Sequence, residues 1–313
     1  MSKLNKTLLV CPTLNPGGMF NDWLCAYGQQ KEKPAAALII DSTSDDGSVE
    51  QAKEFGFSIT VIDRKTFNHG ATRQKAIDDN EGFDFVIFLT QDALLYNDKA
   101  LSELLSAFDS PDVAAVCGRQ LPHKQAKPIE AHARLCSYST VSNVRSLKDA
   151  ESLGIKAAFL SNSFAAYRIS ALQRIGGFPD DVIFAEDMYV AAKLLLAGYS
   201  IAYAADACVY HSHNYSFMQE LRRYFDMGVF HAREPWIRQR LGSAEGAGAK
   251  FIVSEFKYLL KHAIWQIPES FLRTMLRYIG FRLGIMEHKL PIWLKRKLAM
   301  NKGYFADKLN KGI

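Results

Sequence analysis

The chain of 313 residues lacks long hydrophobic runs, although 48% of its residues are hydrophobic. No stretch approaches the ~18 uninterrupted apolar residues that a membrane-spanning helix needs, so we expect no transmembrane segment. The apolar part of the amino-terminal segment is short, is interrupted by Pro12 and lacks a small-residue cleavage pattern, so we expect no signal peptide. The hydrophobic content is nevertheless ample for one large core or two smaller ones.

Cysteines are few, and their spacing excludes two classes of protein. No two of them form a C-x-x-C pair, so neither a disulfide framework nor a zinc site is predicted. The five cysteines are Cys11, Cys25, Cys117, Cys136 and Cys208. Reduced cysteines in a cytoplasmic protein are the plain interpretation. Internal repeats and low-complexity segments are lacking as well.

Negative charge is scarce in the last quarter of the chain. Residues 238–313 hold 15 Lys and Arg against 5 Asp and Glu, a net charge of +10. The rest of the chain has a net charge of −5, so the overall +5 combines an acidic front with a basic tail. This asymmetry predicts an anionic partner for the tail.

Short apolar runs alternate with helix-like segments over the first 120 residues. Strands are predicted at residues 7–14, 35–40, 58–63, 83–89 and 113–116. Helices are predicted at residues 21–30, 47–55, 71–79 and 99–108. This alternation favours an α/β fold with a mostly parallel, Rossmann-like sheet flanked by helices.

The second half of the chain is less regular. Helices are predicted at residues 129–142, 185–198 and 217–233, and a strand at 200–210, while residues 157–168 fit either a strand pair or a loop with one strand. From residue 250 to 283 apolar residues recur at helical spacing. With residues 242–248 as the best linker, we expect an α/β domain over residues 1–235 and a basic, amphipathic helical region over residues 236–313.

Two predicted strands end abruptly in acidic and small polar residues. The segments are LIIDSTSDDGS (residues 38–48) and FLTQDA (residues 88–93). Ligands of open α/β sheets bind just beyond the carboxyl ends of the strands. We therefore expect Asp41, Asp45, Asp46 and Asp92 to share a cleft that suits a metal-bound or hydroxyl-rich ligand, such as a sugar nucleotide, with Ser44 and Gln91 as further candidates for binding it. For the first segment, a capped turn with solvated acids is the alternative.

Two other motifs lie at turns. After the first strand, Thr13 and Asn15 could contact a nucleobase, although an ordinary strand exit is the better explanation of this motif taken alone. In FNHGATR, the start of a predicted helix carries His69, Gly70 and Arg73. Backbone amides at a helix start, together with cationic side chains, suit a diphosphate. The alternative is a polar helix cap with a surface arginine.

The segments GGFPDD and ED precede and open a predicted helix. A carboxylate in a cleft can act as a general base, which makes Asp187 and Glu186 candidates. Acids in a first turn also complement the helix dipole, which is the alternative explanation. His211 and His213 close a strand and could bind metal or phosphate. A single histidine at such a place is more often structural.

Taken in order, PTLN, DSTSDDGS, FNHGATR, TQDA, NSFAAYR, GGFPDD, ED and HSH resemble family 2 glycosyltransferases with the GT-A fold. FNHGATR and LTQDA are similar to the bacterial rhamnosyltransferase branch of that family. The resemblance covers residues 8–215. It implies an inverting transfer from a nucleotide sugar, with dTDP-L-rhamnose as the expected donor. The implied acceptor is a lipid-linked saccharide in the synthesis of a bacterial surface polysaccharide.

The resemblance also implies roles for individual residues. Asp41 matches the acid that binds the base, Asp92 the last Asp of the D-x-D motif, and Asp187 the catalytic base, with Glu186 as a substitute. Thr90 stands where the first Asp of D-x-D would be, so this sequence departs from the family pattern.

A metal-binding or diphosphate-contacting histidine of the family matches His211 or His213. Mg²⁺ or Mn²⁺ is therefore the expected cofactor, because such ions bridge carboxylates and substrate phosphates.

Two other classes of protein remain open. A nucleotidyltransferase would need a Gly-rich, basic loop after the first strand, but residues 15–18 have no nearby Lys or Arg. A nucleic-acid-binding module could use the basic tail. The aromatic residues of the tail, however, fall at helical spacing with Leu and Ile, which favours a core or a membrane interface. They are Trp265, Tyr278, Phe281 and Trp293. We therefore expect no nucleic-acid partner.

The basic tail is expected to dock a cytoplasmic protein on the anionic inner face of the cytoplasmic membrane, near a polyprenyl-diphosphate-linked acceptor. Its clearest element is the basic run at residues 295–297, which follows Trp293. The alternative is a helical subdomain with a solvated basic face, or a contact between copies in a homo-oligomer.

Overall fold

The computed structural model describes residues 2–244 and 246–305, and the end of the predicted helical region (residues 306–313) lies outside the described residues. Within them, nine strands form one sheet in the order β3-β2-β1-β4-β8-β6-β9-β5, and β7 pairs with β9. The strands are β1 (Thr7–Thr13), β2 (Ala36–Asp41), β3 (Ser58–Val61), β4 (Phe85–Leu89), β5 (Leu94–Leu95), β6 (Val113–Leu121), β7 (Asn143–Arg145), β8 (Phe164–Arg168) and β9 (Ser200–Tyr210).

The sheet is mostly parallel, as predicted. Strands β1 to β4 pair in parallel, and so do β6 and β9. Strand β8 is antiparallel to both of its neighbours, β4 and β6, so these two run in the same direction. Strands β5 and β7 are antiparallel to β9. The carboxyl ends of six strands therefore lie at one edge of the sheet.

Helices cover both faces of the sheet, which explains its continuous apolar strands. On β1, Leu9 and Cys11 belong to one hydrophobic cluster, and Leu8 and Val10 to the other, because successive side chains point to opposite faces. The first cluster includes α1 (Met19–Gly28), α2 (Ser48–Glu54) and α4 (Ala100–Ser106). The second includes α3 (His69–Asp78), α7 (Ile169–Arg174) and α8 (Glu186–Leu196).

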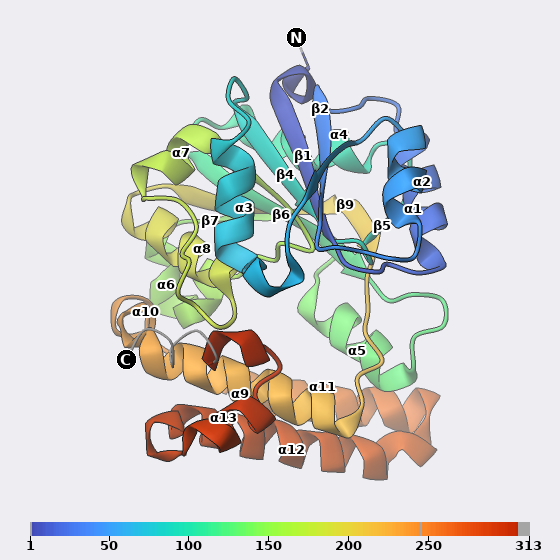
Figure 1. Ribbon diagram of the computed structural model, residues 1–313. Helices are drawn as coiled ribbons and strands as arrows, with labels where there is room; N and C mark the ends of the chain where they lie inside the picture. Colours follow the sequence, from blue (N-terminus) through green and yellow to red (C-terminus); the bar gives the residue numbers. More distant parts are fainter. Residues whose placement is uncertain (1, 245, 306–313) are drawn as a thin grey trace.

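A layer of helices lies beyond the carboxyl ends of the strands, at the bottom of Figure 1. It contains α5 (Pro128–Ser137), α9 (Phe217–Arg233), α10 (Pro235–Leu241), α11 (Ala247–His262), α12 (Ile267–Ile285) and α13 (Ile292–Leu298). Three glycines let α9 and α12 approach closely. A Cβ on Gly280 would lie 2.3 Å from the Leu221 carbonyl oxygen, and one on Gly284 2.1 Å from that of Phe225. A Cβ on Gly228 would meet the Phe281 carbonyl oxygen at 2.3 Å.

Some element boundaries differ from the prediction. Strand β6 continues to Leu121 instead of ending at 116, because it pairs with β9 over its whole length. Helix α5 ends at Ser137 instead of 142, because the chain must turn into β7. Residues 157–168 hold the end of a 3₁₀ turn (Gly154–Ala158) and then β8, so the loop with one strand is confirmed. The domain boundary at 235 stays a prediction.

In the described residues, no helix combines the length and the apolar character that crossing a bilayer requires.

Candidate active site

Strands β1 and β2 end side by side, because Thr13 pairs with Asp41 in the parallel register. The Thr13 hydroxyl donates to Asp41 Oδ1 at 3.0 Å, and the backbone N–H of Ser44 donates to Asp41 Oδ2 at 2.8 Å. Both Thr13 and Asp41 are buried. The predicted base-binding acid is thus fixed at the sheet edge, with its two oxygens oriented by neighbouring groups.

The loops after β1 and β2 are tied to each other by the exposed predicted residues. The backbone N–H of Asn15 donates to Ser44 Oγ at 2.8 Å, and that of Gly17 donates to Asp46 Oδ2 at 3.1 Å. Asn15 and Thr43 have φ of 41° and 62°, which is uncommon for non-glycine residues and clusters at functional sites. Asn15, Ser44 and Asp46 therefore shape the rim of the site rather than its floor.

A cavity of about 280 Å³ lies at these strand ends. Five predicted residues line it: Thr13, His69, Arg73, Gln91 and Asp92. Gln91 connects β4 to β1, because its Oε1 accepts from the Leu14 N–H at 2.7 Å and its Nε2 donates to the Leu14 carbonyl. The cavity can hold part of a nucleotide. Arg64 and Phe67 also line it and were not predicted. Phe67 lies in FNHGATR, whereas no sequence signal marks Arg64.

The FNHGATR motif builds the start of α3 differently from the prediction. Asn68 caps this helix, and its Oδ1 accepts from the N–H groups of Gly70 and Ala71 at 2.9 Å each. These two amides are therefore engaged and are not free for a diphosphate. A Cβ on Gly70 would lie 1.7 Å from the Pro179 carbonyl oxygen. Glycine is required here because the GGFPDD loop packs against the helix start.

Arg73 links the cavity to the second group of predicted residues. Its guanidinium pairs with Glu186 Oε1 at 3.0 Å and donates to the His69 carbonyl at 2.8 Å. Arg73 and Glu186 are both buried. The charge of Arg73 is thus already paired, and one function of FNHGATR is to hold Glu186.

Glu186 and Asp187 open α8 in different environments. Ala185 precedes them in the left-handed region, with φ of 56°, a strained conformation for a residue with a Cβ. Asn162 holds both acids, because its Nδ2 donates to Glu186 Oε1 at 3.0 Å and its backbone N–H donates to Asp187 Oδ2 at 3.2 Å. Glu186 is buried, whereas Asp187 is partly exposed. Asp187 is therefore the more accessible base.

Asn162 is a site residue that sequence reasoning missed. The Tyr167 hydroxyl donates to its Oδ1 at 2.5 Å, which fixes the orientation of the amide. Its only sequence signal is its place at the start of NSFAAYR, a motif used for the family resemblance without an assigned role.

The electrostatics of the pair favour Asp187 as a proton acceptor. Burial and the neighbouring Glu186 carboxylate raise the pKa of Asp187 to about 7. Burial acts in the same sense on Glu186, but Arg73, His69 and Asn162 outweigh it and lower the pKa of Glu186 below its ordinary value. A base with a pKa near neutrality is well matched to proton transfer at physiological pH.

Asp92, His211 and His213 come together at the ends of β4 and β9, with ligand atoms all within 4.8 Å of one another. His211 Nε2 lies 3.4 Å from Asp92 Oδ1, and His213 Nδ1 lies 3.6 Å from Asp92 Oδ2. Gln120 Oε1 lies 2.9 Å from His211 Nδ1, which orients that ring. One carboxylate and two imidazoles are a donor set that fits a divalent cation.

Thr90, which occupies the position of the first Asp of the D-x-D motif, stabilises this cluster by a hydrogen bond. Its hydroxyl donates to Asp92 Oδ1 at 2.7 Å. Burial and the neighbouring His211 lower the pKa of His213 to about 4, so its imidazole is neutral at pH 7 and offers a lone pair.

Asp92 also lines a second cavity, of about 300 Å³, on the other side of Gln91. This cavity is lined by polar groups from α1 and from the loop after β6, among them Asp22, His123 and Lys124. Asp92 and Gln91 therefore line both cavities.

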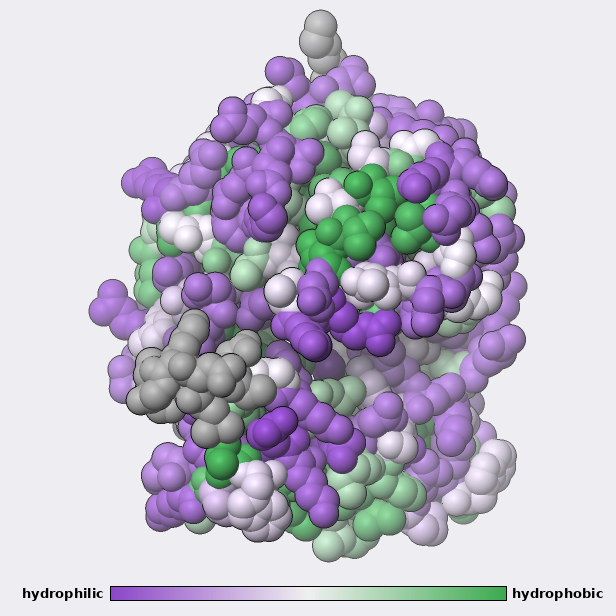
Figure 2. Space-filling model, viewed as in Figure 1, coloured by the Kyte–Doolittle hydropathy of each residue, from purple (hydrophilic) through white to green (hydrophobic). Residues whose placement is uncertain are grey.

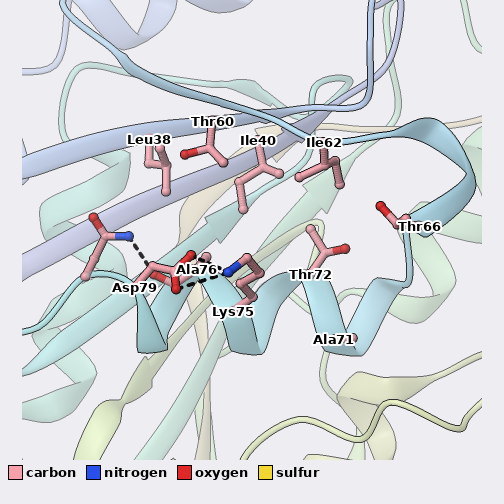
Figure 3. A pocket seen from close by; sticks show the side chains of 11 residues that line it. Leu38, Ile40, Thr60, Ile62, Thr66, Ala71, Thr72, Lys75, Ala76 and Asp79 are labelled. Atoms are coloured by element: carbon pink, nitrogen blue, oxygen red, sulfur yellow. Dashed lines mark hydrogen bonds and ion pairs between the residues drawn. The ribbon is translucent and has the colours of Figure 1, made fainter.

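A third cavity, of about 200 Å³, lies between β2, β3 and α3 (Figure 3). Leu38, Ile40 and Ile62 face the helix, and the Lys75 ammonium pairs with Asp79 at 2.9 Å. None of the predicted site residues lines it. We therefore assign this space to the packing of α3 on the sheet.

Solved structures establish the class of fold. The mannosyltransferase PcManGT from Pyrobaculum calidifontis, in complex with GDP-Man and Mn²⁺, aligns with a TM-score of 0.56 at 17% identity and covers 98% of this chain and 86% of its own. Residues 1–349 of TarS from S. aureus, in complex with UDP-GlcNAc, align with a TM-score of 0.54 at 15% identity, covering 98% and 92%. The fold is that of GT-A glycosyltransferases, as the resemblance implied.

The chain belongs to the family 2 glycosyltransferases, because the family described as glycosyl transferase family group 2 matches residues 85–283. Two curated relatives span nearly the whole chain. The O-antigen chain rhamnosyltransferase WbaN of Salmonella anatum is 48% identical over 300 residues, 96% of this chain and 95% of its own. The O-antigen chain rhamnosyltransferase RfbN of Salmonella typhimurium is 47% identical over 303 residues, 96% of each chain. This protein is therefore a glycosyltransferase.

Proposed function

We propose that this glycosyltransferase moves L-rhamnose from dTDP-L-rhamnose to a saccharide acceptor in the synthesis of an O-antigen chain. The observation that carries the proposal is the 48% identity to an O-antigen chain rhamnosyltransferase over 96% of the chain. The nucleotidyltransferase and nucleic-acid alternatives have no comparable support.

The chemistry is a single displacement. An acceptor hydroxyl oxygen attacks the anomeric carbon of rhamnose, the bond from that carbon to the diphosphate oxygen breaks, and the hydroxyl proton moves to Asp187. The dTDP leaves with the bonding electrons. Asn162 orients the Asp187 carboxylate, and the neighbouring Glu186 carboxylate, which Arg73 keeps ionised, raises the affinity of Asp187 for the proton. No covalent nucleophile is needed.

Donor binding is assigned to the strand ends. Thr13 lines the cavity and can contact a thymine or a ribose, whereas Asp41 is buried, does not line the cavity and orients the Thr13 hydroxyl. Asp92, His211 and His213 would hold a divalent cation, and such an ion neutralises the charge that develops on a departing diphosphate. Two imidazoles favour Mn²⁺ over Mg²⁺, because Mg²⁺ prefers a shell of oxygen ligands.

A thermal-shift panel with dTDP-L-rhamnose, UDP-glucose and GDP-mannose, each with Mn²⁺, Mg²⁺ or EDTA, tests the donor. We expect the largest stabilisation with dTDP-L-rhamnose and Mn²⁺, and its loss in Asp92→Ala. The matched control is Asp79→Ala, an acid of the α3 surface, which should behave as the wild type. Equal stabilisation by all three nucleotide sugars would contradict the donor assignment, and equal stabilisation in EDTA would contradict the metal site.

We also propose that the acceptor is carried on a polyprenyl diphosphate and that the protein docks on the anionic inner face of the cytoplasmic membrane. The docking surface is the apolar face of α11–α13, which Figure 2 shows in part on the lower helical layer. Its exposed side chains are Ile252, Val253, Phe256, Leu260, Ile264, Trp265, Phe271, Leu272, Met275, Tyr278, Ile279 and Trp293. Apolar patches of this extent mark interaction sites, and aromatic rings suit the membrane interface.

Charge complementarity selects an anionic partner for this face. The three acids between residues 247 and 300 are buried or paired: Glu255 is 1% exposed, Glu269 pairs with Arg273 at 2.8 Å, and Glu287 pairs with Lys295. The exposed cations of the same segment are Lys250, Lys257, Lys261, Arg282, Lys289, Arg296 and Lys297. The exposed charged side chains of these helices are thus all positive. Each basic residue near an anionic leaflet contributes about 1 kcal/mol to membrane binding.

Flotation with phosphatidylglycerol-containing liposomes tests the docking. We expect the protein to float at low salt, to be released as salt screens the charges, and to lose binding in Trp265→Ser/Trp293→Ser and in Lys257→Glu/Lys261→Glu. Lys53→Glu, on α2 at the other end of the molecule, is the control. Protein that ignores these liposomes at low salt, or that forms dimers through the same residues, would overturn the membrane assignment.

A further inference from the structure

A fourth cavity, outside the donor site, lies between the sheet edge and the helical layer. Its volume is about 820 Å³, compared with about 280 Å³ and 300 Å³ for the two cavities beside Asp92. The end of α5, strand β7, the 3₁₀ turn at 154–158 and the first turns of α11 form its walls. This volume is in the range of pockets that hold a whole small ligand.

The cavity has an excess of positive charge. Arg145, Lys156 and Lys250 line it, and Asp149 is the one acid among its lining residues. The Asp149 carboxylate is already engaged, because its Oδ2 accepts from the N–H and the hydroxyl of Ser146 at 2.7 Å and 2.9 Å. These hydrogen bonds favour the ionised carboxylate, so it offsets one of the three positive charges and the cavity keeps a positive excess.

Arg145 is the buried member of this group. It is 8% exposed, and its guanidinium donates only to the backbone carbonyls of Lys156 and Phe159, at 3.0 Å and 2.7 Å. Its Nε has no hydrogen-bond partner among the described residues, and no carboxylate there lies within ion-pair distance. Asp149 acts on Arg145 only from beyond ion-pair distance, and an incompletely compensated buried cation is costly, so an anionic ligand in the cavity would be stabilised by it.

The remaining lining residues suit a ligand with hydroxyls and an apolar part. Phe159, Tyr203 and Phe251 supply aromatic surfaces, and Ser137 and Ser254 supply hydroxyl groups.

The position of the cavity in the fold also bears on its function. The chain that leaves Phe159 reaches Asn162 three residues later, and Asn162 binds Asp187. On the opposite wall, α11 turns Lys250 and Phe251 to the cavity and Ile252 and Val253 to solvent.

We propose that this cavity binds the diphosphate and first sugar of a lipid-linked acceptor, between the membrane-facing side of α11 and the loop that carries Asn162. The inference rests on the proposed function. Arg145 and the two lysines would contact the diphosphate, the aromatic rings would pack on the sugar, and the lipid would leave the cavity along α11.

Cys136 provides a direct readout, because its exposed thiol lines the cavity. We expect farnesyl diphosphate to slow the reaction of Cys136 with a maleimide reporter about tenfold, and inorganic pyrophosphate to slow it less, because a charge-assisted contact is worth ~1.5–3 kcal/mol. A Cys136→Ser variant gives the background from other thiols. dTDP should give no protection.

The variant Lys156→Gln/Lys250→Gln changes only exposed residues, so it avoids the folding risk of replacing Arg145. It should abolish the protection and raise the acceptor KM about tenfold, while the KM for dTDP-L-rhamnose stays the same. Protection that survives in this variant, or its absence in the wild type, would overturn the inference. If farnesyl diphosphate protects Cys136 but no rhamnosyl transfer occurs, the proposed function fails and the anion site stands.

Discussion

Glu220 of the helical layer and Asp187 at the strand ends are held in opposite ways. In the helical layer, Glu220 is buried and accepts from Arg273 and from Arg277, so its charge is fully compensated. At the strand ends, Glu186 has Arg73 as a partner, but Asp187 next to it accepts only from backbone N–H groups. The comparison separates acids that hold helices together from an acid that is kept available for protons.

Backbone strain follows the same division. Among the described residues, the non-glycine residues with positive φ are Asn15, Thr43 and Ala185, and all three lie beside the candidate site. Such conformations persist only where the surrounding structure holds them in place. The helical layer contains none within residues 217–244 and 246–305, and its exposed face instead combines apolar side chains with lysine and arginine. One half therefore holds the strained loops of the candidate site, and the other exposes an apolar and basic face.

The largest effect is expected from Asp187→Asn. We expect kcat to fall about 10²–10⁴-fold while the affinity for dTDP-L-rhamnose is retained, because only proton transfer is lost. Steady-state kinetics and donor calorimetry measure the two quantities. Asp180→Asn, a nearby exposed acid of the GGFPDD loop, is the matched control and should keep full turnover. A folded Asp187→Asn enzyme with normal kcat would remove Asp187 as the base.

Glu220→Ala should give the opposite pattern. Removing this carboxylate leaves Arg273 with Glu269 and Arg277 with Glu255 at 3.6 Å, so we expect a loss of about 3 kcal/mol in the free energy of unfolding, the lower end for a broken buried pair. Urea denaturation followed by circular dichroism measures it. At temperatures where the variant is folded, kcat in detergent should be that of the wild type. A stable Glu220→Ala protein with impaired kcat would contradict the division between the two halves.

Gly70→Ala tests how closely the start of α3 packs against the GGFPDD loop in the α/β half of the molecule. An added Cβ would lie 1.7 Å from the Pro179 carbonyl oxygen, so the GGFPDD loop must move. We expect a loss of about 1–3 kcal/mol in stability, together with weaker turnover, because this loop leads to Ala185 and Asp187. Gly18→Ala is the control, since a Cβ there meets no atom within 4 Å. Differential scanning calorimetry measures the melting temperature of each variant. Equal melting temperatures for Gly70→Ala and Gly18→Ala would contradict the close packing at Gly70.

The smallest effect concerns pH. With its pKa raised to about 7, Asp187 is protonated below that pH, so kcat/KM should rise through neutrality and level off above it. In Glu186→Gln the neighbouring negative charge is gone, so the rising limb should move to lower pH. A pH–rate profile at constant ionic strength measures both curves. Superimposable limbs would show that Glu186 does not act on the base.

Much of the fold and of the donor-side site could be predicted, because buried parallel strands leave continuous apolar runs that end in polar residues. The switch from apolar to polar residues at the strand ends was enough to predict that Asp41 and Asp92 lie at the edge of the sheet. The partners of Arg73 could not be predicted, because Glu186 lies more than a hundred residues away and the register between them is set by tertiary packing. Strands β5 and β7 were missed because two or three residues carry no periodic signal.

The helical tail shows a second limit. Its helical spacing was read correctly, and α11 and α12 lie within the predicted region, but spacing alone does not tell a buried face from an exposed one. Trp265 is 73% exposed, whereas Gly280 lies against the backbone of α9. Asn162 was missed for a related reason, since its importance comes from hydrogen bonds to two acids that are distant in the chain.

The central claim is a single-displacement transfer of rhamnose with Asp187 as the base. The most direct test is the NMR analysis of the product formed from dTDP-L-rhamnose and a lipid-linked saccharide acceptor. The account predicts a rhamnosyl product whose anomeric configuration is opposite to that of the donor. A product that retains the donor configuration would require a covalent or front-face route and would contradict the account.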